Sequence, residues 1–413
     1  MSQKRPTEEK TEADLKPLYT RSVVNSLSSG MVNPFTGAYA VKLGATSSLM
    51  GWFQSSSNIS NNVMQVVWGR LSDRLKKRIP FIVLGGLIVS VLWIPMIFVT
   101  NATQLIMLLA VQALLGSMAT PALTAIIGDL VPTSRFGRAN ASIFLWASIG
   151  GLIATLASGI LMVTIGGTLQ EMFFIPLTAA TALGIISCLP VLGMKEKKNT
   201  EKTDLKQHFF SDIFSVLKYA RRNRDFLKYC YVAATFEFFM SIAWPLFSIT
   251  QVTVLNASML QLALLSVVQS IVMIAFQGWA GKRADTTGRK PLLALFRFSL
   301  ITVPIAYALS PNINTLIAVG AFWGLANALG QAAVTAYLLD VSPEEHRGSF
   351  AAIFNLVMGI TTFFGSLIGG YLSDYLTSIF GLVLALQIVY LISTIGRAIG
   401  AAFHLTLKET LRR

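Results

Sequence analysis

One carboxylate, Glu237, is the only acidic side chain that the 413-residue sequence places deep within a long apolar stretch. On a helix it shares a face with Ser241, Trp244 and Ser248. A charge near the centre of a bilayer costs at least ~2.5–3.5 kcal/mol, so such a residue marks a function by default. Glu237 could bind a cationic group, hydrogen-bond a sugar hydroxyl or carry a coupling proton, or it could be a neutral acid that a neighbouring helix satisfies. We predict that it couples solute movement to an ion.

Neutral polar side chains recur at helical spacing in several other apolar stretches. Amides hydrogen-bond across membrane helices, so packing would explain any one stripe. Stripes on several helices that should line one cavity instead favour solute binding. The predicted cavity residues are Asn25, Ser29, Asn33, Asn58, Asn61, Gln65, Glu237, Ser241, Gln269, Trp323, Asn327 and Gln331.

Two arginines, Arg297 and Arg397, also interrupt apolar stretches. Both fall near predicted cytoplasmic helix ends, so we expect their head groups to snorkel to the interface. The cysteines, Cys188 and Cys230, fit no metal spacing, and the histidines lie in predicted loops or at a helix end. We therefore predict no catalytic residues, no metal, no cofactor and no enzymatic activity.

A charged loop occurs twice, at residues 69–78 and 281–290. In each copy a glycine precedes an aspartate by four positions, and basic residues follow. A second pair of landmarks, Asp129 and Asp340, lies close to the same register. These matches indicate a duplicated chain whose halves correspond.

The elements that must hold these residues are long apolar segments. The chain is 54% hydrophobic and 13% charged, with a mean hydropathy of +0.62, which is too apolar for a soluble globule. A membrane-spanning helix needs ~20 apolar residues, and the runs are too long and uninterrupted for a β-barrel. We predict an all-α membrane protein with twelve spans at 20–41, 46–69, 79–100, 103–130, 138–166, 171–193, 227–253, 257–280, 291–310, 313–340, 348–374 and 379–406.

Nearly all of the 33 lysines and arginines fall in the N-terminal tail, the even-numbered loops, the central loop and the C-terminus. This positive-inside pattern predicts a multi-pass protein of the plasma membrane with both termini in the cytoplasm. The same distribution explains the net charge of +14 without a nucleic-acid partner.

These segments divide the chain into five predicted regions. A cytoplasmic tail, 1–18, precedes a six-helix bundle, 19–193. A cytoplasmic linker, 194–226, contains apolar residues at helical spacing beside basic ones, which predicts an amphipathic helix on the membrane surface. A second six-helix bundle, 227–406, precedes a short cytoplasmic tail, 407–413.

On these residues the chain resembles the major facilitator superfamily, over residues 20–406. The signature of that family between helices two and three is Gly-x-x-x-Asp-Arg/Lys-x-Gly-x-Arg/Lys-Arg/Lys. Both loop copies follow it, although Lys76 replaces the second glycine of the first copy and Thr286 replaces a basic residue of the second. The resemblance implies two pseudo-symmetric six-helix bundles that rock about a central site and expose it to each side in turn.

The resemblance also implies that the loop gates access. Its aspartates lie at predicted cytoplasmic helix ends, where a carboxylate can accept from the N-terminus of a neighbouring helix. Arg138 and Arg347, which open helices five and eleven, are the expected partners, and the alternative is that these charges only set topology. The predicted gating residues are Gly69, Asp73, Arg74, Arg78, Asp129, Arg138, Gly281, Asp285, Arg289, Asp340 and Arg347.

We therefore predict a secondary active transporter, a monomer in the lipid bilayer, that moves a small organic solute by alternating access. The sequence has no nucleotide-binding motif, so we expect coupling to H⁺ or Na⁺. The run Arg78-Ile79-Pro80-Phe81-Ile82 is similar to sugar–cation symporters, which favours symport of a sugar-like or other polar neutral solute. The alternatives are a proton-coupled drug or metabolite efflux antiporter and, in another class, a transporter-like membrane sensor. Helix five lacks the Gly-Pro of the antiporters, and the tails are short for a signalling domain.

Overall fold

The computed structural model describes residues 6–75, 77–131, 133–194 and 221–411, and their side chains except those of 6–14, 73, 133–139 and 345. Within these ranges the chain is helical and contains no strand. The predicted all-α class is therefore confirmed. Most of the predicted linker and the ends of both tails lie outside the described residues.

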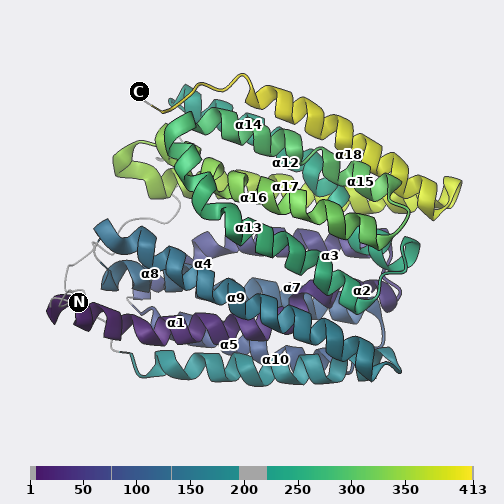
Figure 1. Ribbon diagram of the computed structural model, residues 1–413, viewed down its shortest axis with the longest axis horizontal. Coiled ribbons are helices and arrows are strands. Elements are labelled where there is room, and N and C mark those ends of the chain that lie inside the picture. Colours follow the sequence, from purple (N-terminus) through teal and green to yellow (C-terminus); the bar gives the residue numbers. More distant parts are fainter. Residues whose placement is uncertain (1–5, 76, 132, 195–220, 412–413) are drawn as a thin grey trace. The chain divides into compact units, whose positions relative to one another are not determined.

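The first compact unit comprises Met1–Tyr39 and Met64–Thr203. Its helices are α1 (Pro6–Val32), α4 (Gln65–Leu75), α5 (Ile79–Val91), α6 (Trp93–Met96), α7 (Ala102–Gly116), α8 (Ala119–Leu130), α9 (Thr133–Ile165) and α10 (Leu169–Leu192). In this unit α1 packs against α9 and α10, and α10 packs in turn against α5, as Figure 1 shows.

Small hydroxyl side chains bind α1 to its neighbours. Ser158 of α9 donates a hydrogen bond to the carbonyl of Met31, and Ser28 of α1 donates to the carbonyl of Ala180, each at 2.6 Å. Small polar residues serve in this way between membrane helices, because lipid supplies no hydrophobic drive for helix association. Part of the polar character of α1 is thus used for packing.

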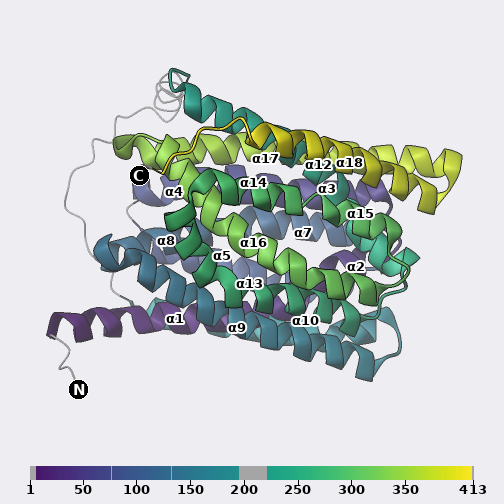
Figure 2. The same cartoon turned by 45° about the horizontal axis from the view of Figure 1, so that its top comes forward.

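The second compact unit comprises Ala40–Val63 and Asp204–Arg413. Its helices are α3 (Ser47–Ile59), α12 (Arg224–Ile249), α13 (Met259–Thr287), α14 (Arg289–Ser299), α15 (Thr302–Leu309), α16 (Ile313–Val341), α17 (Arg347–Phe380) and α18 (Leu382–His404). The short helix α2 (Thr36–Lys42) and the π-helical segment Ser60–Met64 each contain residues of both units. Figures 1 and 2 show α12 beside α17 and α18, and α13 beside α16.

Helix starts and ends in the second unit follow local chemistry. Asn223, Ser258 and Asn312 each accept a hydrogen bond from a backbone N–H in the first turn of α12, α13 and α16. Gly288 and Gly381 connect α13 to α14 and α17 to α18 with φ of 114° and 77°, values that L side chains rarely adopt. These residues fix where α12, α13, α14, α16 and α18 begin.

Helices α12 and α17 approach closely because α17 carries glycine at the contact. A Cβ atom added at Gly369 would lie 2.0 Å from the carbonyl oxygen of Ile242. Small residues allow such backbone approach between membrane helices. This contact supports the helix that carries Glu237.

Ten helical stretches among the described residues are long and apolar enough to cross a membrane. They correspond to the third to twelfth predicted spans. The first two predicted spans, which carry amide and hydroxyl stripes, are not among the ten. The structure also interrupts them, with a 3₁₀ turn at Asn33–Phe35 and the π-helical segment at Ser60–Met64.

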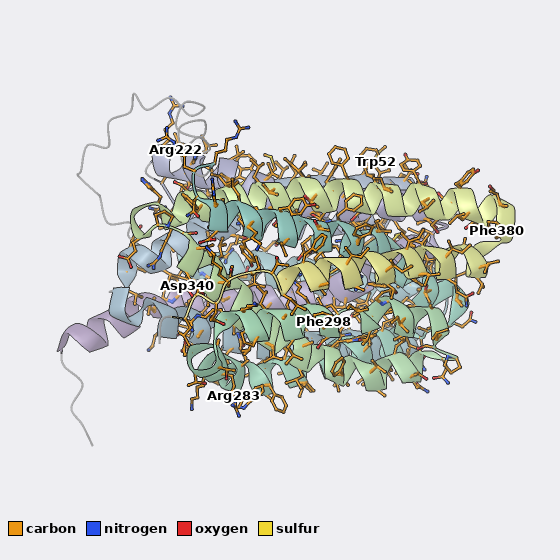
Figure 3. The ribbon with its side chains drawn as sticks, turned by 90° about the horizontal axis from the view of Figure 1, so that it is seen from above. Trp52, Arg222, Arg283, Phe298, Asp340 and Phe380 are labelled. Carbon is orange, nitrogen blue, oxygen red and sulfur yellow. The ribbon has the colours of Figure 1, made fainter. Side chains whose placement is uncertain are left out.

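Three charged side chains and two phenylalanines of the second unit lie at different places along its helices. Figure 3 shows Arg222, Arg283 and Asp340 toward one end of the unit and Phe380 at the other. Phe298, which is exposed, lies along the flank between them. Apolar residues are exposed in this way on the lipid-facing surface of membrane proteins.

Candidate functional site

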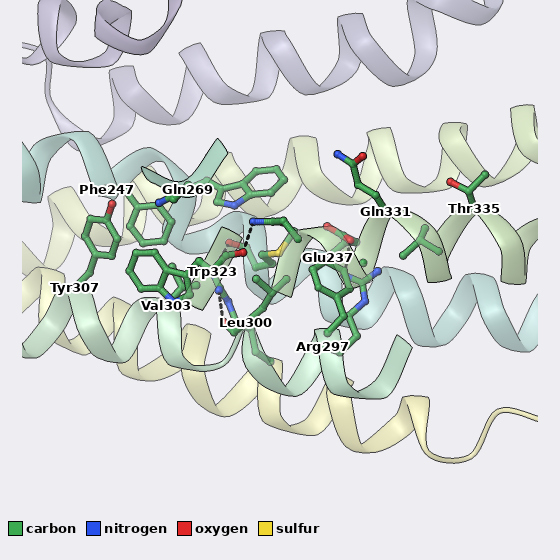
Figure 4. A pocket seen from close by; sticks show the side chains of 17 residues that line it. Glu237, Phe247, Gln269, Arg297, Leu300, Val303, Tyr307, Trp323, Gln331 and Thr335 are labelled. Carbon is green, nitrogen blue, oxygen red and sulfur yellow. Dashed lines mark hydrogen bonds and ion pairs between the residues drawn. The ribbon is translucent and has the colours of Figure 1, made fainter. Parts of the chain in front are cut away.

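A cavity of about 600 Å³ lies within the second unit, lined by residues of α12, α13, α14, α15, α16 and α18 (Figure 4). Gly324 lets α16 approach α13, because a Cβ atom there would lie 2.4 Å from the carbonyl oxygen of Gln269. Pockets for small organic ligands have volumes of ~300–1,000 Å³. The cavity is therefore large enough for such a molecule.

The charged part of the cavity holds an ion pair between α12 and α14. Nη1 of Arg297 donates to Oε1 of Glu237 at 2.8 Å. The Arg297 side chain is 3% exposed and that of Glu237 is 16% exposed. The guanidinium also lies over the rings of Phe236 and Phe296, 4.5 and 5.1 Å from their centroids. Removing either charge would leave the other buried and uncompensated, which is costly in a protein interior.

A second guanidinium, that of Arg397 on α18, also lines the cavity and is 1% exposed. Its Nε donates to Ser393 Oγ at 3.1 Å, and Nη1 and Nη2 donate to the carbonyls of Leu300 and Met240 at 2.8 and 3.2 Å. The prediction that Arg297 and Arg397 snorkel to the interface is therefore wrong. Both head groups find acceptors inside the protein, so neither needs to reach the interface.

The other end of the cavity is aromatic, as Figure 4 shows for Phe247 and Tyr307. These two rings stack with centroids 4.2 Å apart, and Tyr307 and Trp323 lie 5.9 Å apart in nearly parallel planes. Gln251 donates to the Tyr307 hydroxyl at 2.6 Å, and Trp323 Nε1 donates to Thr302 Oγ1 at 3.1 Å. These hydrogen bonds hold the rings as a wall with polar groups at its edges.

Three predicted amides, Gln269, Asn327 and Gln331, also line the cavity. Asn327 Nδ2 donates to the carbonyl of Trp323 at 2.9 Å, and Gln331 accepts from Gln277 at 3.5 Å. With Glu237 and Trp323, the structure brings five of the twelve predicted residues into one cavity. Their role in binding a solute stays a prediction.

Two further predicted residues of the second unit make contacts with α17. Ser241 is fully buried, and its Oγ would meet a Cβ atom at Gly365 at 2.0 Å. Asn58 of α3 donates through Nδ2 to the Thr362 carbonyl and to Ser366 Oγ, both at 3.3 Å. Neither residue lines the cavity, and both contribute to helix packing.

The remaining predicted residues lie elsewhere. Asn61 is exposed in the π-helical segment Ser60–Met64. Four residues belong to the first unit, of which three are half-buried and one, Asn33, is exposed. The three half-buried residues are Asn25, Ser29 and Gln65. A part for these four residues in a solute site stays a prediction.

In the first unit an ion pair holds the charged loop. Nε of Arg78, which precedes α5, donates to Oδ2 of Asp129 at the end of α8 at 2.7 Å. The side chains of Asp73 and Arg138 lie outside the described residues, so their expected pairing is untested. The loop is nevertheless tied to the fourth predicted helix of its own unit.

The second unit repeats this pair. Nε of Arg289 donates to Oδ2 of Asp340 at 3.1 Å, and in both units the arginine and aspartate are 51 residues apart. Asp285 pairs with Arg289 at 3.2 Å, and Arg347 pairs with Glu344 at 3.4 Å. Among the described side chains, Asp285 therefore does not pair with Arg347, and a gating role for Arg347 stays a prediction. Arg289, four positions after Asp285 and at the start of α14, supplies the cation instead.

The C-terminal segment adds a carboxylate beside Arg289. Glu409 accepts hydrogen bonds from the backbone N–H groups of Arg289 and Lys290, at 2.9 and 3.1 Å. Burial raises the pKa of Glu409, but hydrogen bonds from four backbone N–H groups lower it by more, so the pKa lies below its ordinary value. The sequence predicts that a loop aspartate accepts hydrogen bonds from a helix N-terminus. At the N-terminus of α14 the carboxylate that does so is Glu409.

Sequence reasoning missed Arg297, Arg397 and Tyr307 as cavity residues. A usable signal was present, because ionisable side chains within membrane helices usually pair with one another. The rule connects the lone acid Glu237 with an arginine of the same half of the chain. Which arginine it is depends on helix rotation, which spacing alone does not give.

The sequence profile of the Major Facilitator Superfamily matches residues 19–313 and 230–410. Two uncharacterised MFS-type transporters of Methanocaldococcus jannaschii are 23% and 24% identical to the chain, over 88% and 89% of it and over 90% and 93% of their own lengths. Among solved structures, a mutant of the nucleoside transporter NupG has a TM-score of 0.74 at 16% identity, covering 95% of this chain and 98% of NupG. A D-xylose–proton symporter has a TM-score of 0.71 at 13% identity, covering 97% and 98%.

These similarities extend over nearly the whole chain and agree with its succession of apolar helices. The structural neighbours, at such low identity, show the fold alone. The profile match covers both halves of the chain. The chain therefore belongs to the Major Facilitator Superfamily, whose members are membrane transporters rather than enzymes.

Proposed function

We propose that this protein is a secondary active transporter that moves a small polar organic solute through the cavity of the second unit and couples that movement to a proton at Glu237. The observation that carries the proposal is the Glu237–Arg297 ion pair, 2.8 Å long, at the edge of a cavity of about 600 Å³. The proposal includes a multi-pass placement in the plasma membrane with both termini in the cytoplasm.

The proton would act by switching the ion pair. Ionised Glu237 holds Arg297 through a charge-assisted hydrogen bond, and protonation removes the negative charge from that bond. Arg297 is then a buried cation without a counter-charge, which favours binding of an anion or a change in its surroundings. Sodium suits the site less well, because it would have to displace a cation that already bonds the carboxylate.

The solute is proposed from the other groups of the cavity. Gln269, Asn327 and Gln331 favour hydroxyl, amide or carbonyl groups, since an amide both donates and accepts. The rings of Phe247 and Tyr307 add an apolar surface against which a flat group packs. A sugar-like solute is one example of a small polar solute with such groups. The sequence favours symport, in which the solute and the proton cross the membrane in the same direction.

Flux through the purified protein in liposomes tests this proposal. With a panel of sugars, nucleosides, amino acids and organic acids, we expect accumulation of at least one solute only when a pH gradient is imposed. Glu237→Gln should retain solute exchange and lose accumulation, because the amide keeps the shape but releases no proton.

Asp225→Asn is the matched control, since Asp225 pairs with Lys408 at 3.1 Å outside the cavity. This variant should accumulate solute as the wild type does. Accumulation by Glu237→Gln at the wild-type level, or uptake that ignores the pH gradient, would contradict the proposal.

A further inference from the structure

We infer that the ligand of this cavity is an organic anion with one carboxylate joined to a flat, apolar body such as an aromatic ring. The inference rests on the proposed function and narrows the substrate class of the same site. It departs from the neutral, sugar-like solute that the sequence favours. Three observations carry it: the charge of the cavity, its unused donors and the separation of its charged and aromatic ends.

The charge of the cavity is positive in every protonation state of Glu237. Two guanidinium groups, Arg297 on α14 and Arg397 on α18, face one carboxylate, Glu237 on α12. The net charge of the lining side chains is +1 when all three groups are ionised, and it is +2 when Glu237 is protonated. Of the described lining residues, those from α13 and α16 are uncharged, and α15 adds only the phenol of Tyr307.

Excess charge inside a membrane protein is costly unless another group neutralises it. A solute with one negative charge brings the sum to zero when Glu237 is ionised. A neutral sugar leaves the excess unchanged, and a cationic solute increases it. Charge alone therefore favours a monoanion.

The two guanidinium groups also have hydrogen-bond donors to spare. Arg297 Nε is buried and has no partner among the described residues. A guanidinium has five N–H donors, and Arg397 uses three of them on Ser393, Leu300 and Met240. Buried donors without acceptors are rare in native proteins, so a ligand or a water molecule is expected to accept from each such donor. A carboxylate offers the acceptor oxygens that guanidinium groups bind best.

The shape of the cavity indicates the chemistry of the rest of the ligand, beyond its carboxylate. Figure 4 shows Tyr307 and Phe247 toward one end, Glu237 and Arg297 farther along the cavity, and Gln331 and Thr335 beyond them. The stacked rings of Phe247, Tyr307 and Trp323 form an apolar wall, which suits a flat ring and does not suit a second charge. An amphipathic anion fills both ends at once.

Binding to the full-length protein in detergent tests the inference with three probes of similar size. They are 3-phenylpropanoate, its neutral amide and 3-phenylpropylamine, compared by calorimetry at pH 7. We expect the carboxylate to bind at least about tenfold more tightly than the amide, a difference of ~1.4 kcal/mol, and the amine to bind most weakly. A carboxylate that binds no more tightly than the amide, or that does not bind, overturns the inference.

A variant then assigns the preference to the cavity. In Arg397→Gln the carboxylate should bind no more tightly than the amide binds to the same variant. Arg283→Gln is the control, because Arg283 is exposed on α13 and outside the cavity. Carboxylate preference that survives in Arg397→Gln would overturn the assignment to this site. The wild-type comparison decides the ligand class even if Arg397→Gln does not fold.

The binding experiment separates this inference from the proposed function. If the protein transports the amide or a sugar with protons but shows no preference for the carboxylate, the inference of an anionic ligand is refuted and the proposed transport is not. A protein that prefers the carboxylate but carries no solute across a liposome membrane refutes coupled transport alone.

Discussion

At the residue scale, the decisive feature is one carboxylate among two arginines in helices that cross a membrane. Glu237 is bonded to Arg297, whose guanidinium also contacts two aromatic rings. Arg397 relies on backbone carbonyls and a serine. The hydrogen-bond partners of Arg397 do not include Glu237, so under the proposed coupling the Arg297 pair is the one that protonation of Glu237 would weaken.

Removing Arg297 should therefore expose the cost of an unpaired buried carboxylate. We expect Arg297→Leu to lower the free energy of unfolding by about 3–5 kcal/mol in the wild type. In the Glu237→Gln background the same change should cost clearly less, since the remaining side chain is neutral. Unfolding of the four proteins in detergent completes this double-mutant cycle. Equal costs in the two backgrounds would argue against a stabilising ion pair.

At the element scale, close helix contacts determine where the cavity side chains lie. Helix α12 carries Glu237 and is packed on α17 through glycine, while α16 is packed on α13 in the same way. Ser241 at the α12–α17 contact lies against α17, and Asn58 of α3 bonds to α17, so neither lines the cavity. Helix packing has thus taken up predicted cavity residues of α12 and α3.

A methyl group at the α12–α17 contact should disturb this arrangement. Gly369→Ala places Cβ 2.0 Å from the Ile242 carbonyl oxygen, so the helices must move apart. We expect a loss of ~1–3 kcal/mol in unfolding free energy, as for other overpacked sites. Gly278→Ala on α13 is the control, since no atom lies within 4 Å of its Cβ position, and it should be neutral or stabilising by up to ~1 kcal/mol. Equal thermal stability of the two variants would count against the importance of this contact.

At the scale of the whole molecule, each unit carries the same ion pair. Arg78 with Asp129 and Arg289 with Asp340 join the charged loop to a helix end of their own unit. Because the pairs are internal, they would keep each loop with its unit if the two units move as rigid pieces during transport. This gives the repeated loop a structural task within each half, and its gating role stays a prediction.

Neutralising either aspartate should then slow transport without weakening binding. We expect Asp129→Asn and Asp340→Asn to lower the rate of solute exchange in liposomes, in the same direction in both units. Affinity measured by calorimetry should match the wild type, because neither residue lines the cavity. Asp225→Asn serves again as a surface-pair control. Loss of affinity together with rate, or a normal rate in both variants, would contradict the role of these pairs.

Local and periodic properties were predictable from the sequence. Helical apolar runs, the uneven basic charge and the repeated loop led to the fold class and the family, because each depends on residues close together in the chain. The amides Gln269, Asn327 and Gln331 were also found, since the helices that carry them line the cavity. The pairing of Asp285 with Arg289 was not predicted, because the two residues lie on either side of Gly288, where α13 ends and α14 begins.

By itself, the sequence determined that this protein is a duplicated α-helical transporter with a lone intramembrane acid in its second half. Only the tertiary structure decided which charges accompany that acid. Arg297 lies 60 residues from Glu237, and the two meet because the rotation of α12 and α14 turns both side chains toward one cavity. Hydropathy and spacing record how apolar a helix is, but its neighbours decide which face looks inward.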